Sequence, residues 1–144
     1  MARPGPGMPH GIYYYDYKRK DWLLLRKDGE PLKPGELGDG LYVIYFYNLM
    51  CGACRAFTPH WMVFAEVMAG KLDNVIPLVV LCDWFSSMCD SKAAGDTFNE
   101  FDVDSTPTVI MVKVKGGSII DKSRLSGVVS SDDLFKIAKR YAKL

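Results

Sequence analysis

An uninterrupted apolar run, LYVIYFY at residues 41–47, limits the folds open to this chain. Such a run of β-branched and aromatic residues, without polar residues at alternate positions, is typical of a strand covered on both faces. From Cys51 to about Ala69 large apolar side chains recur at helical spacing, and Gly70 supplies a stop. A second apolar run, VIPLVVL, follows at 75–81. A buried strand, a helix and another buried strand predict a parallel pair of strands with helices on the faces of the sheet.

The remaining segments predict antiparallel strands and two further helices. Two pairs of apolar runs, each joined by a short turn, are typical of β-hairpins: IYYYDY (12–17) with WLLLR (22–26), and TVIMVKV (108–114) with SIID (118–121). Part of the stretch 88–101 is expected to be helical, and a last helix is expected to begin near Ser130 or Ser131. We therefore predict an α/β fold, with a central mixed β-sheet flanked by helices and an N-terminal β-hairpin extension.

Composition and charge limit the function classes open to the chain. It has 144 residues, of which 24% are charged, and a formal net charge of +1. These values are typical of one soluble domain, and the densest basic run, YKRK at 17–20, is too short to indicate a nucleic-acid surface. No apolar run reaches the roughly 18 residues that a bilayer span needs. We expect a flexible tail over 1–11, a single domain over 12–144, a monomer, and neither nucleic-acid nor membrane partners.

The cellular compartment bears on the redox state of the four cysteines. Residues 1–11 contain no hydrophobic segment that could act as a secretory signal. We expect a cytoplasmic protein, or one of the secretory pathway or ER lumen if a signal peptide was removed. The chain contains no glutamine and three asparagines, a depletion typical of thermophiles. Because hyperthermophiles keep disulfides in their cytoplasm, these cysteines need not be reduced.

The stretch FYNLMCGACRAF at 46–57 holds Cys51 and Cys54, and a lone C-x-x-C is compatible with a redox pair, two metal ligands or two buried thiols. Here Cys51 is expected just beyond the central strand, with Cys54 in the first turn of the following helix. A thiol at a helix N-terminus faces unpaired backbone N–H groups, which favour the thiolate. The thiolate is the species that attacks a disulfide, and Cys54 is close enough to resolve the mixed disulfide. The arrangement indicates redox chemistry.

Two segments carry a resemblance to a known family. YFYNLMCGACRAFTPHW resembles the active-site segment of the thioredoxin and protein disulfide isomerase superfamily, including a structural proline at the position of Pro59. DVDSTPTVIMV resembles the second signature of that superfamily, a cis-proline that faces the dithiol, here Pro107 preceded by Thr106. The likeness covers about 41–144, and it implies a thioredoxin-like fold.

The resemblance also implies a function. It implies a thiol:disulfide oxidoreductase in which Cys51 attacks a protein disulfide and Cys54 resolves the mixed disulfide. The backbone at Thr106, beside Pro107, would align the extended chain of the substrate. The expected partners are protein dithiol or disulfide substrates and a redox partner protein, with no cofactor and no metal.

The chain departs from the pattern of the superfamily in three places. Met50 stands where tryptophan is common before the first cysteine, and Gly-Ala separates the two cysteines. Tyr45 stands where a buried acid commonly relays the proton of the resolving thiol. A phenol with an ordinary pKa of about 10 is a poor acceptor at neutral pH, so Cys54 would need water or another carboxylate, for which Asp83 is a candidate. The direction of electron flow is therefore open.

Cys82 and Cys89 form a second pair, spaced C-x6-C, that begins at the end of a strand. Some disulfide isomerases and sulfhydryl oxidases have a similar pair, so the resemblance implies a structural disulfide that closes a small loop. Two free thiols are an alternative, as is a second redox pair or metal ligation.

Two alternative functions belong to other classes. Four thiolates suit zinc, so all four cysteines could form a structural zinc site, although their spacing is uneven. The chain could also be a redox-inactive thioredoxin-like binding or chaperone module, which the residues Tyr45 and Met50 favour.

Overall fold

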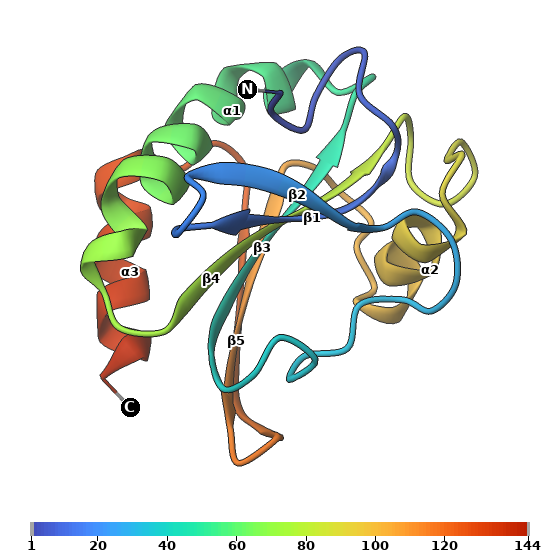
Figure 1. Ribbon diagram of the computed structural model, residues 1–144. Coiled ribbons are helices and arrows are strands. Elements are labelled where there is room, and N and C mark those ends of the chain that lie inside the picture. Colours follow the sequence, from blue (N-terminus) through green and yellow to red (C-terminus); the bar gives the residue numbers. More distant parts are fainter. Residues whose placement is uncertain (1, 144) are drawn as a thin grey trace.

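A six-stranded mixed β-sheet forms the centre of the computed structural model, which describes residues 2–143 (Figure 1). The strands follow the spatial order β2-β1-β4-β3-β5-β6. Their bounds are β1 (Gly11–Asp16), β2 (Asp21–Arg26), β3 (Gly40–Asn48), β4 (Val75–Cys82), β5 (Thr108–Lys115) and β6 (Ser118–Ser126). Strands β3 and β4 pair in parallel, and every other neighbouring pair is antiparallel. The predicted mixed sheet and N-terminal hairpin are confirmed.

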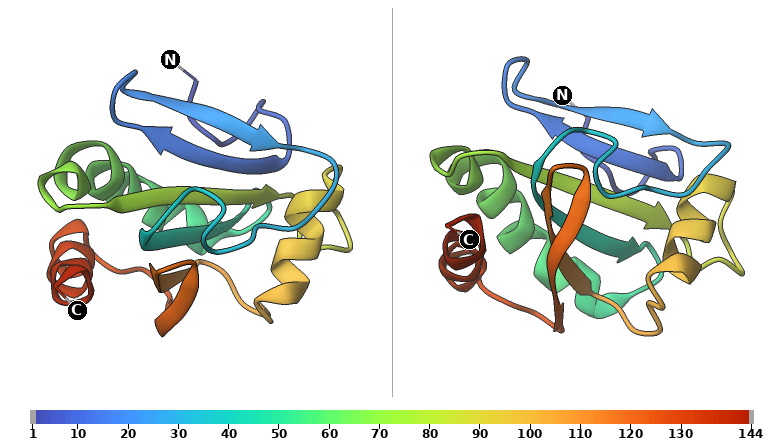
Figure 2. Two further views of the ribbon diagram at one scale, coloured as in Figure 1. Left: turned by 60° about the horizontal axis from the view of Figure 1, so that its bottom comes forward. Right: turned by 90° about the horizontal axis from the view of Figure 1, so that it is seen from below.

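Helices cover both faces of the sheet, as Figures 1 and 2 show. Helix α1 (Gly52–Val63) continues through a π-helical turn (Phe64–Met68) and a short 3-10 turn (Ala69–Lys71). Together with α3 (Ser131–Ala142), it packs on one face, whereas α2 (Lys92–Glu100) packs on the other. Helix α2 is the helical part expected within 88–101, and α3 begins after Ser130, which caps it as expected. None of the helices in residues 2–143 is long and apolar enough to cross a bilayer.

Strand β3 is the centre of the core, because all nine of its residues are buried. Alternation of side chains sends Val43 and Tyr45 toward α1 and α3, and Ile44 and Phe46 toward α2. Its neighbour β4 contains Pro77, which cannot donate a ladder hydrogen bond. The ladder between β1 and β4 ends at Leu78, so Pro77 lies beyond it and is not required to donate a hydrogen bond to β1.

Residues 2–10, expected from the sequence to form a flexible tail, pack against the domain. The Arg3 guanidinium binds the Glu66 carboxylate through Nε–Oε2 (2.9 Å) and Nη2–Oε1 (2.7 Å). Pro4 and Gly5 are buried, and Gly11 already belongs to β1. The segment is rich in proline and glycine, so its packing rests on long-range contacts that a local pattern does not reveal. The first residue of the expected tail and the last residue of the chain lie outside the described residues.

Replacing Glu66 by glutamine should reduce the loss of unfolding free energy that occurs as the pH falls into the acid range. Burial would raise the pKa of Glu66, but hydrogen bonds from Arg3 and from the Trp22 indole (2.8 Å) outweigh it, so the pKa lies below its usual value. A carboxyl with a lowered pKa adds stability above its unfolded pKa of about 4.3, and this is lost as the pH falls through the folded pKa. We expect Glu66→Gln to cost about 1 kcal/mol at pH 7, since Arg3 is partly exposed.

Urea unfolding at pH 7 and at pH 3 measures this difference. The difference between the wild type and Glu66→Gln should shrink at pH 3, and Glu100→Gln, at the exposed end of α2, is the matched control. A difference that stayed constant between the two pH values would contradict the assigned ion pair.

Candidate active site

Cys51 is the N-cap residue of α1, directly after the turn that follows β3. Its backbone is extended (φ −103°, ψ 114°), and its Sγ accepts a hydrogen bond from the backbone N–H of Cys54 (3.1 Å). The N–H of Cys51 donates to the carbonyl of Asn48 (3.1 Å), which holds the turn against the end of the strand. The thiol therefore lies at the helix N-terminus, where the sequence predicts it.

A cis peptide bond between Thr106 and Pro107 faces the dithiol. The Cys51 Sγ lies 3.4 Å from the Thr106 carbonyl oxygen, to which the thiol donates. Pro59, the proline of the first signature, lies inside α1. It is on the side of α1 that faces residues 3–6 of the N-terminal segment. The structure thus brings Cys51, Cys54, Thr106 and Pro107 together and leaves Pro59 to the helix.

The Cys51 thiol is poised to ionise. Burial would raise its pKa, but hydrogen bonds from the Cys54 thiol, the Thr106 side chain and the N–H groups of Cys54 and Ala53 outweigh burial. The net pKa of Cys51 therefore lies below its ordinary value. Its side chain is a candidate nucleophile because the thiolate is the reactive species.

The Cys54 thiol has the opposite character. It is fully buried, and burial followed by its hydrogen bond to Cys51 raises the pKa of Cys54 to about 11. A buried thiol that keeps its proton does not compete with Cys51 for an external disulfide. The pair can therefore divide into an attacking thiolate and a resolving thiol.

Tyr45 occupies the place where a buried acid was sought. Its hydroxyl lies 3.0 Å from Thr58 Oγ1 and 3.3 Å from the Cys54 carbonyl oxygen, and burial raises its pKa above the ordinary value. The hydroxyl is therefore a hydrogen-bond donor that supports the first turn of α1. The sequence-based candidate for a proton acceptor, Asp83, has its carboxylate 3.2 Å from His10 Nε2 and is 43% exposed.

One buried polar residue of the site was missed from the sequence. Asn48 is fully buried at the end of β3, and its side chain joins two separate segments. Its Nδ2 donates to Thr106 Oγ1 (3.2 Å), and its Oδ1 accepts from the backbone N–H of Phe85 (2.8 Å). The only sequence signal was that Asn48, a polar residue, directly follows the apolar run LYVIYFY. A polar residue in that position commonly indicates only the end of a strand.

A disulfide joins Cys82 and Cys89 and closes the loop 83–88, as the resemblance implied. The loop lies beside the dithiol, because the N–H groups of Leu49 and Met50 donate to the carbonyls of Cys82 (2.9 Å) and Asp83 (3.1 Å). Cys51 and Cys54 are left as free thiols. The zinc alternative is therefore wrong, since two of its four thiolates are bonded to each other.

Removing this disulfide should destabilise the fold. The two cysteines are seven residues apart, and closing a loop of that length contributes about 2–3 kcal/mol in the chain-entropy account. We expect Cys82→Ser with Cys89→Ser to lower the free energy of unfolding by that amount. Urea unfolding without reductant measures it, and the difference from the wild type should vanish in strong reductant, where the wild type loses the bond too.

The loop carries exposed apolar side chains next to the site. Trp84 is 42% exposed, and Met50, whose backbone bonds to Asp83, is 57% exposed. Phe85 instead turns inward and packs edge-on against Phe98 at a ring-centroid distance of 5.6 Å. Of these two neighbouring aromatic residues, only Trp84 therefore presents an exposed ring.

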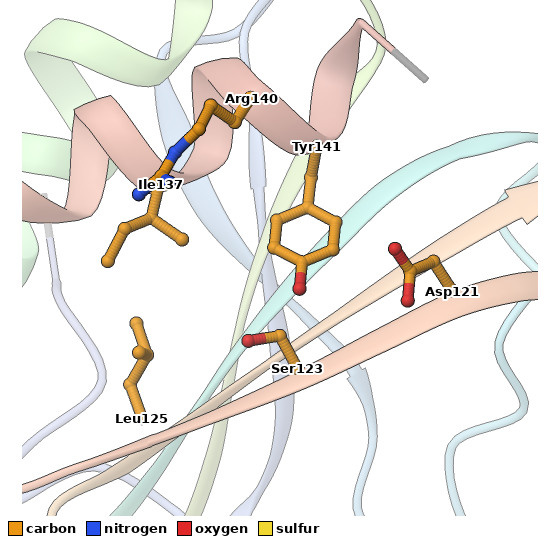
Figure 3. Close-up of a pocket in the computed structure, with 6 residues that line it drawn as sticks. All are labelled: Asp121, Ser123, Leu125, Ile137, Arg140 and Tyr141. Carbon is orange, nitrogen blue, oxygen red and sulfur yellow. The ribbon is translucent and has the colours of Figure 1, made fainter.

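A separate cavity of about 410 Å³ lies between β6 and α3 (Figure 3). Figure 3 shows the Tyr141 side chain reaching toward Asp121 and Ser123 of β6. None of the six residues that line it is a cysteine, so it is distinct from the dithiol site.

Comparisons with known proteins agree with this geometry. A family model described as Thioredoxin matches residues 36–140, whereas no curated protein matches the chain. Similar solved structures include thioredoxin from Aeropyrum pernix, at 19% identity and TM-score 0.58, with 93% of this chain and 96% of that chain covered. Malaria parasite thioredoxin-2 is 24% identical with TM-score 0.54, covering 81% and 98%, respectively. Spinach chloroplast thioredoxin f is 19% identical with TM-score 0.53, covering 82% and 93%.

Proposed function

Because the chain belongs to the thioredoxin family, we propose that it is a thiol:disulfide oxidoreductase of protein substrates. The observation that carries the proposal is the opposite character of two free thiols three residues apart. The pKa of Cys51 is lowered at the helix N-terminus, whereas burial raises the pKa of Cys54 to about 11. This difference decides which sulfur attacks and which one resolves.

The proposed reaction has two exchange steps. The Cys51 thiolate attacks one sulfur of a substrate disulfide, a bond forms between the two sulfurs, and the other substrate sulfur leaves as a thiolate. Cys54 then passes its proton to water or to the released substrate thiolate and attacks Cys51 Sγ, which releases the second substrate thiolate and leaves a Cys51–Cys54 disulfide. Two electrons pass from the dithiol to the substrate, and the reverse sequence oxidises a substrate dithiol.

The segment before Pro107 is proposed to hold the substrate. The Thr106 carbonyl faces Cys51 Sγ at 3.4 Å, so an extended chain paired there would bring its own sulfur to the attacking atom. Strand-like pairing uses backbone groups and accepts many sequences. The exposed ring of Trp84, in the loop whose Asp83 carbonyl accepts from the Met50 N–H, would add an apolar contact.

The reduction potential of the Cys51–Cys54 couple tests the proposal and sets its direction. The protein is equilibrated with glutathione buffers, the free thiols are alkylated, and mass spectrometry assigns the label to each cysteine. A potential near about −270 mV would indicate a reductase for a reducing cytoplasm, and one above about −200 mV a disulfide donor or isomerase for an oxidising compartment. The absence of a reversible Cys51–Cys54 couple would refute the proposal.

A second candidate is a redox-inactive binding or chaperone module. Tyr45 favours it, because the site lacks a carboxylate at the position that commonly accepts the proton of the resolving thiol. Such a module would bind extended polypeptide but would not accelerate the reduction of insulin disulfides by dithiothreitol. The leading proposal also requires a partner protein that restores the redox state of the dithiol, and it requires no second copy of the chain.

A further inference from the structure

The Asn48 side chain lies between the dithiol and the disulfide-closed loop. It is fully buried, and burying a carboxamide is unfavourable unless its polar atoms are hydrogen-bonded. Both polar atoms of the Asn48 carboxamide are hydrogen-bonded: one lies 3.2 Å from Thr106 Oγ1 and the other 2.8 Å from the backbone nitrogen of Phe85. The two partners lie 58 and 37 residues away along the chain, so the contact exists only in the folded protein.

The chemistry of the two partners determines which amide atom faces which. A backbone N–H can only donate, so the atom that faces Phe85 must be Oδ1. The atom that faces Thr106 is then Nδ2, which can only donate. The Thr106 hydroxyl oxygen therefore accepts from Asn48, and the hydroxyl proton must point elsewhere.

Thr106 is also the residue that meets the attacking sulfur. Its carbonyl oxygen accepts a hydrogen bond from Cys51 Sγ at 3.4 Å, and its side chain lowers the pKa of both thiols. A hydrogen bond lowers a thiol pKa when it is donated to the thiolate. Because the Thr106 hydroxyl oxygen accepts from Asn48, its proton is free to stabilise a negative sulfur.

We propose that Asn48 is a positioning residue for the dithiol: its carboxamide holds Thr106 beside Cys51 Sγ, with the hydroxyl proton directed away from Asn48, and anchors Thr106 to the loop at Phe85. The inference rests on the proposed function, because it concerns the state of the attacking sulfur. Asn48 reaches the cysteines through its backbone as well, since its carbonyl accepts from the Cys51 N–H at 3.1 Å. The loop end of the anchor is itself held by the disulfide.

A double-mutant cycle on Cys51 ionisation tests the proposal. The rate of Cys51 alkylation is followed against pH, with mass spectrometry separating Cys51 from the other cysteines. Thr106→Val should raise the Cys51 pKa by about one unit, because it removes the hydroxyl that lowers this pKa. Asn48→Ala should raise it by a smaller amount, because the hydroxyl remains but is free to rotate.

In the double variant, Asn48→Ala should add nothing to the rise caused by Thr106→Val. Asn99→Ala is the matched control, because Asn99 accepts a hydrogen bond from Ser86 of the same loop (3.1 Å) but is exposed. It should leave the Cys51 profile unchanged. A profile unchanged by Asn48→Ala would overturn the proposal, as would rises that add in the double variant.

A second measurement needs no change at Asn48, in case that variant does not fold. The chain has three asparagines and no glutamine, so the side-chain amide region of a ¹⁵N-correlated NMR spectrum contains three NH₂ groups. In a pH titration of the reduced protein, the chemical shifts of the Asn48 NH₂ group should change with a midpoint at the Cys51 pKa. The chemical shifts of the Asn99 NH₂ group should not change at that pH. Thr106→Val should greatly reduce the shift of the Asn48 pair, and a shift of equal size in that variant would overturn the proposal.

These measurements separate the inference from the proposed function. Cys51 titrates whether or not the protein exchanges disulfides with a substrate. A raised Cys51 pKa in the variants, together with a wild type that lacks a reversible couple, would retain Asn48 as a positioning residue and reject the oxidoreductase.

Discussion

Replacing Cys51 by serine is expected to reduce the turnover of protein disulfides to the uncatalysed rate. A serine hydroxyl does not ionise at neutral pH, so the interactions with Cys54, Thr106 and the backbone N–H groups that lower the Cys51 pKa cannot make it a nucleophile. Reduction of insulin in the presence of dithiothreitol, followed by turbidity, measures the loss. Turnover that survived Cys51→Ser would show that Cys51 is not the attacking sulfur.

Cys54→Ser should fail at a different step. Its Cys51 can still attack, but nothing resolves the product, so a mixed disulfide with the substrate should accumulate and be visible by mass spectrometry without reductant. The variant with Cys82→Ser and Cys89→Ser is the control at a temperature where it is folded, since it keeps both thiols of the proposed reaction. If this control lost as much turnover as Cys54→Ser, the assignment of the reaction to Cys51 and Cys54 would be contradicted.

Replacing Trp61 by alanine should cause the largest loss of stability, about 3–5 kcal/mol. Trp61 is fully buried in α1, and its ring lies 5.4 Å from Tyr45 and 5.7 Å from Phe64 between centroids. The substitution removes these contacts and leaves a cavity beneath the helix that carries the dithiol. Urea unfolding measures the change, and faster alkylation of Cys54 should accompany it because Tyr45 supports the Cys54 carbonyl.

Trp61→Phe is the matched variant. The buried indole N–H has no hydrogen-bond partner within residues 2–143, so phenylalanine forfeits no hydrogen bond and fills much of the same volume. Its cost should be clearly smaller than that of Trp61→Ala. Equal costs would show that the indole N–H, and not the volume of the ring, matters at this position.

Local patterns explain why the elements were predictable. The apolar run before Cys51 and the helical spacing after it have one compatible structure each, a buried strand and an amphipathic helix. Their order places the dithiol at a helix N-terminus without reference to any distant residue. Ser130 as the cap of α3 is an equally local feature, since its side chain bonds to the N–H of Asp133.

Long-range contacts explain what was not predictable. The proline- and glycine-rich segment is predicted from its sequence to be a tail. In the structure it is held by the ion pair of Arg3 with Glu66, which is 63 residues away. Asn48 likewise reads as the end of a strand until its amide meets Thr106 and Phe85. His10, also assigned to the tail, accepts from the Asp90 N–H at 2.8 Å beside the closed loop.

The sequence by itself determined the strands and helices, the position of the dithiol and its family resemblance, because each follows from neighbours within a few turns of the chain. Only the tertiary structure decided the bonding of Cys82 to Cys89, the packing of residues 2–10 and the partners of Asn48. The packing of residues 2–10 and the partners of Asn48 depend on which distant segments the sheet order β2-β1-β4-β3-β5-β6 brings together. The role of a buried polar side chain depends on the folded structure, because its hydrogen-bond partners come from segments that are distant in the sequence.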